Sequence, residues 1–130
     1  MPESRRRILC VDDDIDTREM IDALLTLQGY EVIQARSISE ALSHAVSTTF
    51  DMILLDWIFE DGTGIDLCTK LKQLGVSAPI LFYSGVTDQA NIQSALDVGA
   101  QGFLVKPVDS KDLLRHLERL VQNRDETSET

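Results

Sequence analysis

Apolar and polar residues follow two alternating periods along this chain. Five short apolar runs have the length of buried strands; they lie at residues 8–11, 32–33, 52–55, 80–83 and 103–105. Between and after them, apolar residues recur at the three- and four-residue spacing of amphipathic helices, within residues 20–25, 38–46, 65–74, 92–98 and 113–121. The pattern therefore predicts five strands that alternate with five helices.

The order and composition of these elements indicate the fold class. The runs MILL and ILFY are continuously apolar, which is typical of parallel strands buried on both faces. Strands that alternate with helices form a parallel sheet with helices on both sides. We therefore predict an α/β fold with a doubly wound, five-stranded parallel sheet. Gly29, Gly75 and Gly99 each follow a helical segment, where glycine commonly ends a helix.

The length and composition favour one domain. A chain of 130 residues with 43% hydrophobic residues can fill a single core, so a second domain is not expected. We assign residues 1–123 to this domain. Residues 124–130 are polar and are predicted to form a mobile tail, because they contain too few apolar groups to offset the entropy lost on ordering.

The charge of the chain narrows its possible partners. A formal net charge of −10 works against direct binding to nucleic acid or to an anionic membrane surface. No segment approaches the roughly 20 apolar residues of a membrane span, and the first residues do not resemble a signal peptide. The expected location is the cytoplasm.

Polar residues follow four of the five predicted strands. Asp12 and Asp13 come after the first strand, Asp56 after the third, Ser84 after the fourth and Lys106 after the fifth. Ligands of doubly wound sheets bind at the carboxyl ends of the strands. Three carboxylates at that edge suit a hard divalent cation, of which Mg²⁺ is the usual choice. A hydroxyl and an ammonium group beside it would suit a phosphoryl group, whose transfer depends on positioning and charge neutralisation.

Four sequence motifs carry a resemblance to a known family. The segments ILCVDDD, LLDWIFEDGTG, LFYSG and FLVKP, in this order and at these intervals, resemble the receiver domain of bacterial two-component response regulators. The resemblance covers about residues 5–123. It implies a flavodoxin-like receiver fold with strand order 2-1-3-4-5.

The resemblance also implies roles for individual residues. Asp56 would accept a phosphoryl group from a phosphohistidine. Asp13 and Asp56 would ligate Mg²⁺ together with the backbone carbonyl of Ile58, and Asp12 would act mostly through bound water. Lys106 and the Ser84 hydroxyl would contact the phosphoryl oxygens.

A conformational switch is implied in the same way. Phosphorylation would draw Ser84 inward, and Phe103, at the aromatic switch position of the family, would rotate into the vacated space. The Lys106–Pro107 peptide bond would be cis. The altered surface would be formed by the fourth helix, fifth strand and fifth helix.

The implied function is that of a signalling domain rather than a conventional enzyme, although such domains promote their own phosphorylation and dephosphorylation. The donor would be a sensor histidine kinase or a histidine phosphotransfer protein, and an output domain or protein would read the altered surface. The pathway, the output and the oligomeric state are left open. So is the choice between a stand-alone receiver and part of a longer regulator or hybrid kinase.

Two local features need their own explanation. Asp14 is a third consecutive aspartate where the family uses a pair, and its place before the first helix suits an N-cap. Glu60 stands four positions after Asp56, where the family very often has proline. Without that proline the loop after Asp56 is less restricted.

Two alternatives remain beside this interpretation. The segment FEDGTG resembles part of the haloacid dehalogenase phosphatase motif, but Phe59 occupies the position of its nucleophilic aspartate. The second alternative is a degenerate receiver, which keeps the fold and binds proteins without being phosphorylated. No expected site residue is missing, which disfavours that alternative.

Overall fold

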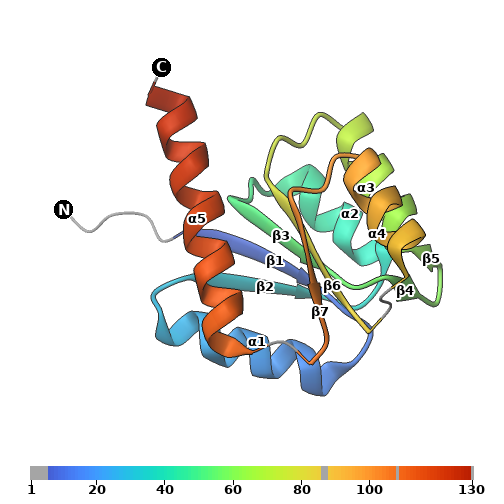
Figure 1. Ribbon diagram of the computed structural model, residues 1–130, viewed down its shortest axis with the longest axis horizontal. Helices are drawn as coiled ribbons and strands as arrows, with labels where there is room; N and C mark the ends of the chain where they lie inside the picture. Colours follow the sequence, from blue (N-terminus) through green and yellow to red (C-terminus); the bar gives the residue numbers. More distant parts are fainter. Residues whose placement is uncertain (1–5, 86–87, 108, 130) are drawn as a thin grey trace.

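The computed structural model describes residues 6–85, 88–107 and 109–129. Its main sheet has five parallel strands in the order β2-β1-β3-β6-β7 (Figure 1). They are β1 (Arg7–Val11), β2 (Glu31–Ala35), β3 (Met52–Leu55), β6 (Ile80–Ser84) and β7 (Gly102–Val105). These five strands correspond, in chain order, to the five predicted strands. The predicted sheet and its strand order are therefore confirmed.

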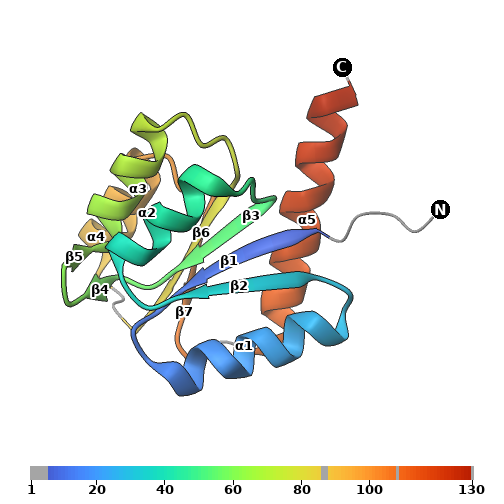
Figure 2. The same cartoon turned by 180° about the vertical axis from the view of Figure 1, so that it is seen from behind.

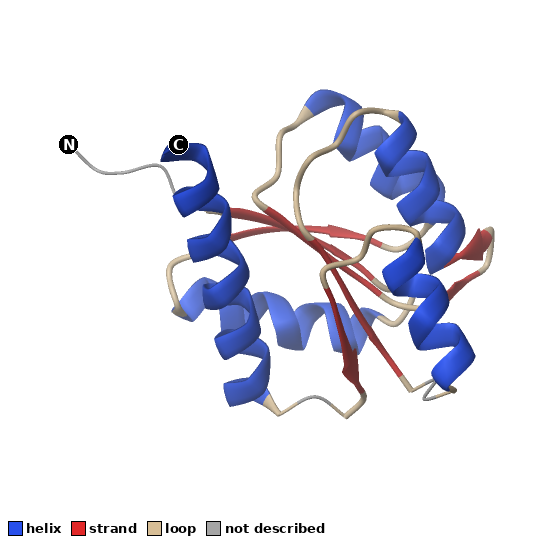
Figure 3. Ribbon diagram, turned by 45° about the horizontal axis from the view of Figure 1, so that its top comes forward, coloured by secondary structure: helices blue, strands red, loops and turns tan. Residues whose placement is uncertain are grey.

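In the part of the chain that the structure describes, five helices cover the two faces of the sheet. They are α1 (Ile15–Leu27), α2 (Ile38–Ser47), α3 (Gly64–Gln73), α4 (Gln89–Asp97) and α5 (Ser110–Glu129). Figure 3 shows α1 and α5 on one side of the sheet and α2, α3 and α4 on the other. Helix α5 continues through residues 124–129, for which the sequence predicts a polar tail. The mobility of that tail stays a prediction.

Each face of the sheet has its own hydrophobic core. Alternate residues of one strand enter opposite cores, as the period of a β-strand requires. In β6, Phe82 packs in the core under α2, α3 and α4, whereas Leu81 and Tyr83 pack in the core under α1 and α5. All five residues of β6 are buried. The two cores hold the strand ends firmly, and these ends carry the polar residues.

The helix termini follow the predicted capping signals. The Asp14 side chain caps α1 by accepting a hydrogen bond from the Thr17 backbone N–H. Gly29, Gly75 and Gly99 follow α1, α3 and α4 with φ angles of 93°, 82° and 105°. A backbone in this left-handed region favours glycine, so the three predicted helix ends are confirmed.

A second, two-stranded sheet lies in the loop after Asp56. Strands β4 (Ile58–Phe59) and β5 (Gly62–Thr63) pair antiparallel and form a small hairpin, visible from behind in Figure 2. Strands of two residues are too short to show a period, so the sequence pattern did not predict them. Glu60 and Asp61 form the turn of this hairpin. The loop is therefore ordered by backbone pairing where the family often uses proline.

Candidate functional site

Three carboxylates gather at the carboxyl ends of β1 and β3. Asp12 and Asp13 directly follow β1, and Asp56 follows β3, its neighbour in the sheet. One oxygen from each of the three lies within 4.8 Å of the others. In the sheet, β1 lies between β2 and β3. The chain passes from β1 to β2 on one side and then to β3 on the other, so the strand order reverses at β1, next to the carboxylates. The predicted convergence of these three carboxylates is confirmed.

Asp12 is the buried member of the cluster. Its side chain is only 1% exposed, and both of its oxygens accept hydrogen bonds. Oδ1 accepts from the Asp14 backbone N–H at 2.9 Å. Oδ2 accepts from the Tyr83 hydroxyl at 2.8 Å and from Lys106 Nζ at 3.1 Å. A buried charge is tolerated only when it is paired and hydrogen-bonded, and these contacts meet both conditions.

Lys106 contacts two of the three carboxylates, Asp12 and Asp56. Its Nζ lies 3.1 Å from Asp12 Oδ2 and 3.1 Å from Asp56 Oδ2. Burial alone would lower the pKa of Lys106, but the hydrogen bonds and negative charges of Asp12 and Asp56 outweigh it, so the pKa is raised. The side chain therefore stays cationic and neutralises part of the charge of both carboxylates.

Asp13 is the exposed member, and the carboxylates beside it disfavour its charge. Its pKa is raised, first by partial desolvation and then by the charges of Asp12 and Asp56. Among the described residues, no cationic side chain forms an ion pair with Asp13, whereas Lys106 pairs with both Asp12 and Asp56. A cation that entered the cluster from solvent would meet Asp13 first and would relieve this repulsion.

Asp56 is held by the backbone around it. Its Oδ1 accepts a hydrogen bond from the Trp57 N–H at 2.7 Å, and its own N–H donates to the Val11 carbonyl at 3.1 Å. Gly64, the first residue of α3, lies so close that a Cβ there would collide with the Asp56 carbonyl oxygen and with the Phe82 ring. Only glycine fits this approach of α3 to the end of β3.

The expected switch residues lie in β6 and β7, on the side of β3 away from β1. Ser84 ends β6 and is 2% exposed, and Val105 is its partner in β7. Phe103 is half-buried and stacks on Phe82, with ring centroids 6.0 Å apart and planes 8° apart. The Trp57 ring lies 6.1 Å from Phe103. These three rings connect the residue after Asp56 with the switch position.

The remaining predicted features lie where the resemblance places them. Ile58 begins β4, two residues after Asp56, and its side chain is exposed. The Lys106–Pro107 peptide bond is cis, as predicted. The role of the Ile58 carbonyl as a metal ligand stays a prediction.

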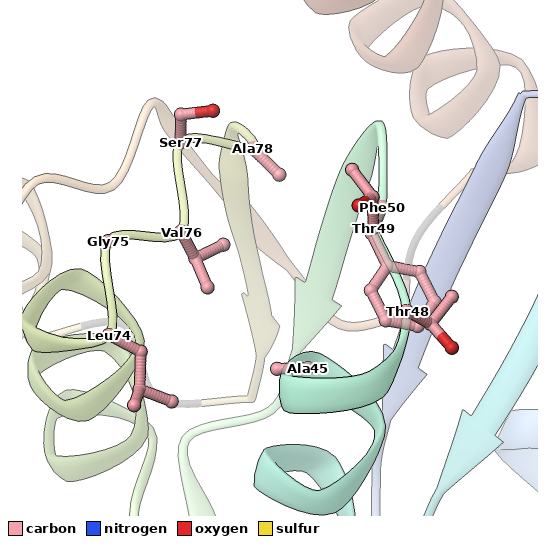
Figure 4. A pocket seen from close by; sticks show the side chains of 9 residues that line it. All are labelled: Ala45, Thr48, Thr49, Phe50, Leu74, Gly75, Val76, Ser77 and Ala78. Carbon is pink, nitrogen blue, oxygen red and sulfur yellow. The ribbon is translucent and has the colours of Figure 1, made fainter.

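Two cavities flank different parts of the fold. One, of about 210 Å³, lies between the α2–β3 and α3–β6 connections at the amino ends of the strands (Figure 4). No ionisable side chain lines it, and it is at the sheet edge opposite Asp56. The other, of about 520 Å³, is a mainly apolar groove between α1 and α5 that reaches Tyr83 and Lys106. The second cavity thus borders the carboxylate cluster through Lys106, whereas the first lies away from it.

Comparison with known proteins agrees with this geometry. Residues 8–118 match the family described as the response regulator receiver domain. The chain belongs to this family. The receiver domain is a signalling domain of two-component systems, and phosphorylation on aspartate and use of Mg²⁺ are general properties of the family.

Relatives of this receiver domain include full-length regulators. The phosphate regulon transcriptional regulatory protein PhoB of Pseudomonas aeruginosa is 34% identical over 90% of this chain and 52% of its own length. The DNA-binding response regulator MtrA of Mycolicibacterium smegmatis is 32% identical over 99% of this chain and 57% of its own. The chain thus spans about half the length of these curated relatives.

Solved structures show the same fold. A CheY-like receiver domain protein of Methanospirillum hungatei superposes with a TM-score of 0.92 at 28% identity, covering 95% of this chain and 99% of its own. The chemotaxis protein CheY4 of Vibrio cholerae gives a TM-score of 0.86 at 34% identity, covering 90% and 99%. Within the described ranges of this receiver domain, no helix combines the length and apolar character needed to cross a membrane.

Sequence reasoning missed one residue of the receiver site. Tyr83 belongs to the apolar run ILFY, which predicts only a buried strand. In the structure its hydroxyl contacts Asp12, and its ring lies 4.8 Å below Lys106 Nζ. The only signal of its role in the sequence is that a tyrosine, which carries a hydroxyl, stands in a buried strand where a large apolar side chain would be sufficient.

The turn of the β4–β5 hairpin ties the loop after Asp56 to α2. Asp61 Oδ1 and Oδ2 accept hydrogen bonds from the Ile38 and Ser39 backbone N–H groups, each at 3.0 Å. These N–H groups at the start of α2 lower the pKa of Asp61. Asp61 thus acts as a helix cap supplied by a distant part of the chain.

Asp61→Ala is expected to lower the free energy of unfolding by about 1 kcal/mol, as the loss of a helix cap does. Because the Asp61 pKa is lowered, this stabilisation is present above the ordinary aspartate pKa and is lost as pH falls through the lowered value. Urea unfolding near neutral pH and at about pH 3 measures both effects. Glu60→Ala, in the same turn, is the control. Equal stability of the two variants at neutral pH would contradict the cap.

Proposed function

We propose that this receiver domain accepts a phosphoryl group on Asp56 from the phosphohistidine of a sensor histidine kinase or a histidine phosphotransfer protein. The proposal is carried by one observation: Lys106 Nζ bridges Asp12 and Asp56 at 3.1 Å each, at the end of the central strand β3. The Asp56 carboxylate would attack phosphorus, so that a P–O bond forms while the P–N bond to the donor imidazole breaks. Lys106 is placed to neutralise charge on the transferred group.

The donor atoms of the cluster fit a divalent cation. Asp12, Asp13 and Asp56 offer only carboxylate oxygens, which Mg²⁺ prefers, and Asp13 is accessible from solvent. Mg²⁺ held there, with the Ile58 carbonyl as a further ligand, would supply charge neutralisation for the phosphoryl oxygens. The protein itself orients the acceptor through the Trp57 N–H and keeps Lys106 beside it.

The phosphorylated form would switch through Ser84 and Phe103. Ser84 is buried at the end of β6, so a movement of its hydroxyl toward the phosphoryl group would leave space beside the aromatic rings. Phe103 is only half-buried and can rotate into that space. Leu96 of α4 and Val105 of β7 are exposed apolar residues on the face that an output domain or protein would read.

Direct contact of the receiver with nucleic acid is not part of the proposal. The net charge of −10 opposes it. The relatives PhoB and MtrA are described as transcriptional and DNA-binding regulators, and they match this chain over 52% and 57% of their own length. Any contact with DNA would then be made by an output domain or a partner.

The competing function is that of a degenerate receiver that binds proteins without being phosphorylated. The two differ in one measurement, the intact mass after treatment with acetyl phosphate. We expect a gain of one phosphoryl group in Mg²⁺ and little or none in EDTA. An unchanged mass with both acetyl phosphate and a phosphorylated histidine donor would favour the degenerate receiver.

A further inference from the structure

Tyr83 is a polar residue in an apolar environment next to the phosphorylation site. It precedes Ser84 in β6 and points to the α1 and α5 side of the sheet, where it packs with Cys10, Leu104 and Leu113. Its side chain is 2% exposed. Packing in this core requires a large apolar side chain, and a leucine or phenylalanine would supply that without a hydroxyl to satisfy.

The hydroxyl of Tyr83 has a specific partner. It donates to Asp12 Oδ2 at 2.8 Å, while the Cys10 thiol lies 3.8 Å away at the limit of a weak contact. A buried hydroxyl without a partner destabilises the folded protein, so this hydrogen bond favours one orientation of both side chains. Every buried side-chain polar atom within the described ranges has such a partner.

The contacts of Asp12 leave room for one more ligand. Its carboxylate accepts from Asp14 N–H on Oδ1 and from Tyr83 and Lys106 on Oδ2. An ionised carboxylate has about four acceptor positions, so the three donors leave about one on Oδ1. That remaining position can face a cation or a water bound to it, in the cluster with Asp13 and Asp56.

Tyr83 also contacts the other charged partner of Asp12. Lys106 Nζ lies 4.8 Å from the centre of the Tyr83 ring, within the range of a cation–π contact. One side chain therefore supports the carboxylate with its hydroxyl and the ammonium group with its ring. Without the hydroxyl, Oδ2 of Asp12 would keep Lys106 as its one donor among the described residues. The carboxylate could then turn toward Lys106 and away from Asp13.

We propose that Tyr83 is a positioning residue that holds Asp12 and Lys106 in the arrangement that admits a divalent cation. The inference rests on the proposed function, because it assigns the cluster to metal-dependent phosphoryl transfer. Tyr83 acts through Asp12 and Lys106 and touches neither the cation nor the phosphoryl group. Residues that orient metal ligands in this way typically change metal affinity by 10- to 100-fold when they are replaced.

Tyr83→Phe is the direct test, because it removes one oxygen and keeps the ring. Trp57 is the single tryptophan of the chain and directly follows Asp56, so its fluorescence can report Mg²⁺ binding without any phosphorylation. We expect the apparent Kd for Mg²⁺ to rise about tenfold in Tyr83→Phe. Isothermal calorimetry with Mg²⁺ gives the same quantity should the fluorescence change be small.

Tyr30→Phe is the matched control. Tyr30 lies just before β2, at the sheet edge opposite the carboxylates, and the substitution removes the same atom. Its Kd for Mg²⁺ should equal that of the wild-type protein. Thermal melts of both variants in EDTA separate positioning from stability, because a merely structural hydroxyl would lower the melting temperature and leave the Kd unchanged.

The outcomes distinguish this inference from the proposed function. Equal Kd values for Tyr83→Phe and wild type overturn the role of Tyr83, while phosphorylation of Asp56 can still be observed. A wild-type protein that binds no Mg²⁺ overturns both. A raised Kd in Tyr83→Phe, with an unchanged Kd in Tyr30→Phe, supports the positioning role.

Discussion

Asp56→Asn is expected to gain no phosphoryl group from acetyl phosphate and Mg²⁺ under conditions that label the wild-type protein fully. The amide removes the nucleophilic carboxylate and keeps the size of the side chain. It also keeps an oxygen that can accept from Lys106, which lies 3.1 Å from Oδ2 in the structure. The loss of phosphorylation is therefore due to the missing nucleophile and not to a change in side-chain size. Intact mass spectrometry measures it directly.

A second aspartate serves as the control for this loss. Asp97 ends α4, is exposed, and accepts a hydrogen bond from Gln93 of the same helix. Asp97→Asn should be labelled as fully as the wild-type protein. Thermal melts in EDTA should show that Asp56→Asn remains folded, because one negative charge has left the cluster. Full labelling of Asp56→Asn would show that the acceptor is another residue.

Asp13→Ala is expected to melt at a higher temperature than the wild-type protein in EDTA and to respond little to Mg²⁺. Lys106 neutralises only part of the charge of Asp12 and Asp56, and Asp13 adds a third negative charge within 4.8 Å of them. Its removal relieves repulsion in the metal-free protein. A cation bound only by the folded state adds RT ln(1 + [L]/Kd), about 2.7 kcal/mol at roughly 100 times Kd, and the variant loses most of this gain.

The effect of Asp13→Ala should depend on pH in a defined direction. The Asp13 pKa is raised in the folded protein, so its destabilising effect is absent below the ordinary aspartate pKa, grows as pH rises through the raised value, and is complete above it. The stabilisation in EDTA should thus be complete at about pH 8 and smaller at about pH 4. Thermal melts at both pH values, with EDTA or excess Mg²⁺, measure it.

Asp16→Ala controls for removal of an acid from the same region. Asp16 is exposed in the first turn of α1, outside the carboxylate cluster, where its charge favours the helix dipole. This variant should not gain stability in EDTA and should respond to Mg²⁺ like the wild-type protein. If Asp13→Ala is instead less stable than wild type in EDTA near pH 8, the carboxylates are not in conflict in the metal-free state.

The strands and the helices could be predicted because each depends on a local pattern, whereas the order of the strands in the sheet came from the resemblance to the receiver family. The continuous apolar runs predict buried parallel strands, and glycine at the helix ends predicts the left-handed positions at Gly29, Gly75 and Gly99. The β4–β5 hairpin could not be predicted in this way. Its stability comes from two short strands and from Asp61, whose partners Ile38 and Ser39 lie 22 or more positions away in sequence.

The carboxylate cluster could be predicted because strand ends of a parallel sheet meet at one edge. Its internal pairing depends on side-chain conformations that no sequence period encodes. That Lys106 contacts both Asp12 and Asp56, while Asp13 stays exposed, is visible only in the folded chain. The same holds for Tyr83, because an apolar strand pattern does not distinguish a buried phenol from a buried phenylalanine.

Three consecutive residues at the end of β6 have three different surroundings. Phe82 stacks on Phe103 on one face of the sheet, Tyr83 holds Asp12 on the other, and Ser84 lies at the edge. Side chains of a strand alternate between the two faces of the sheet. Deletion or insertion of one residue in β6 would therefore turn Phe82 away from Phe103, toward α1 and α5, and would turn Tyr83 away from Asp12. Natural variation in this strand should therefore conserve the number of its residues.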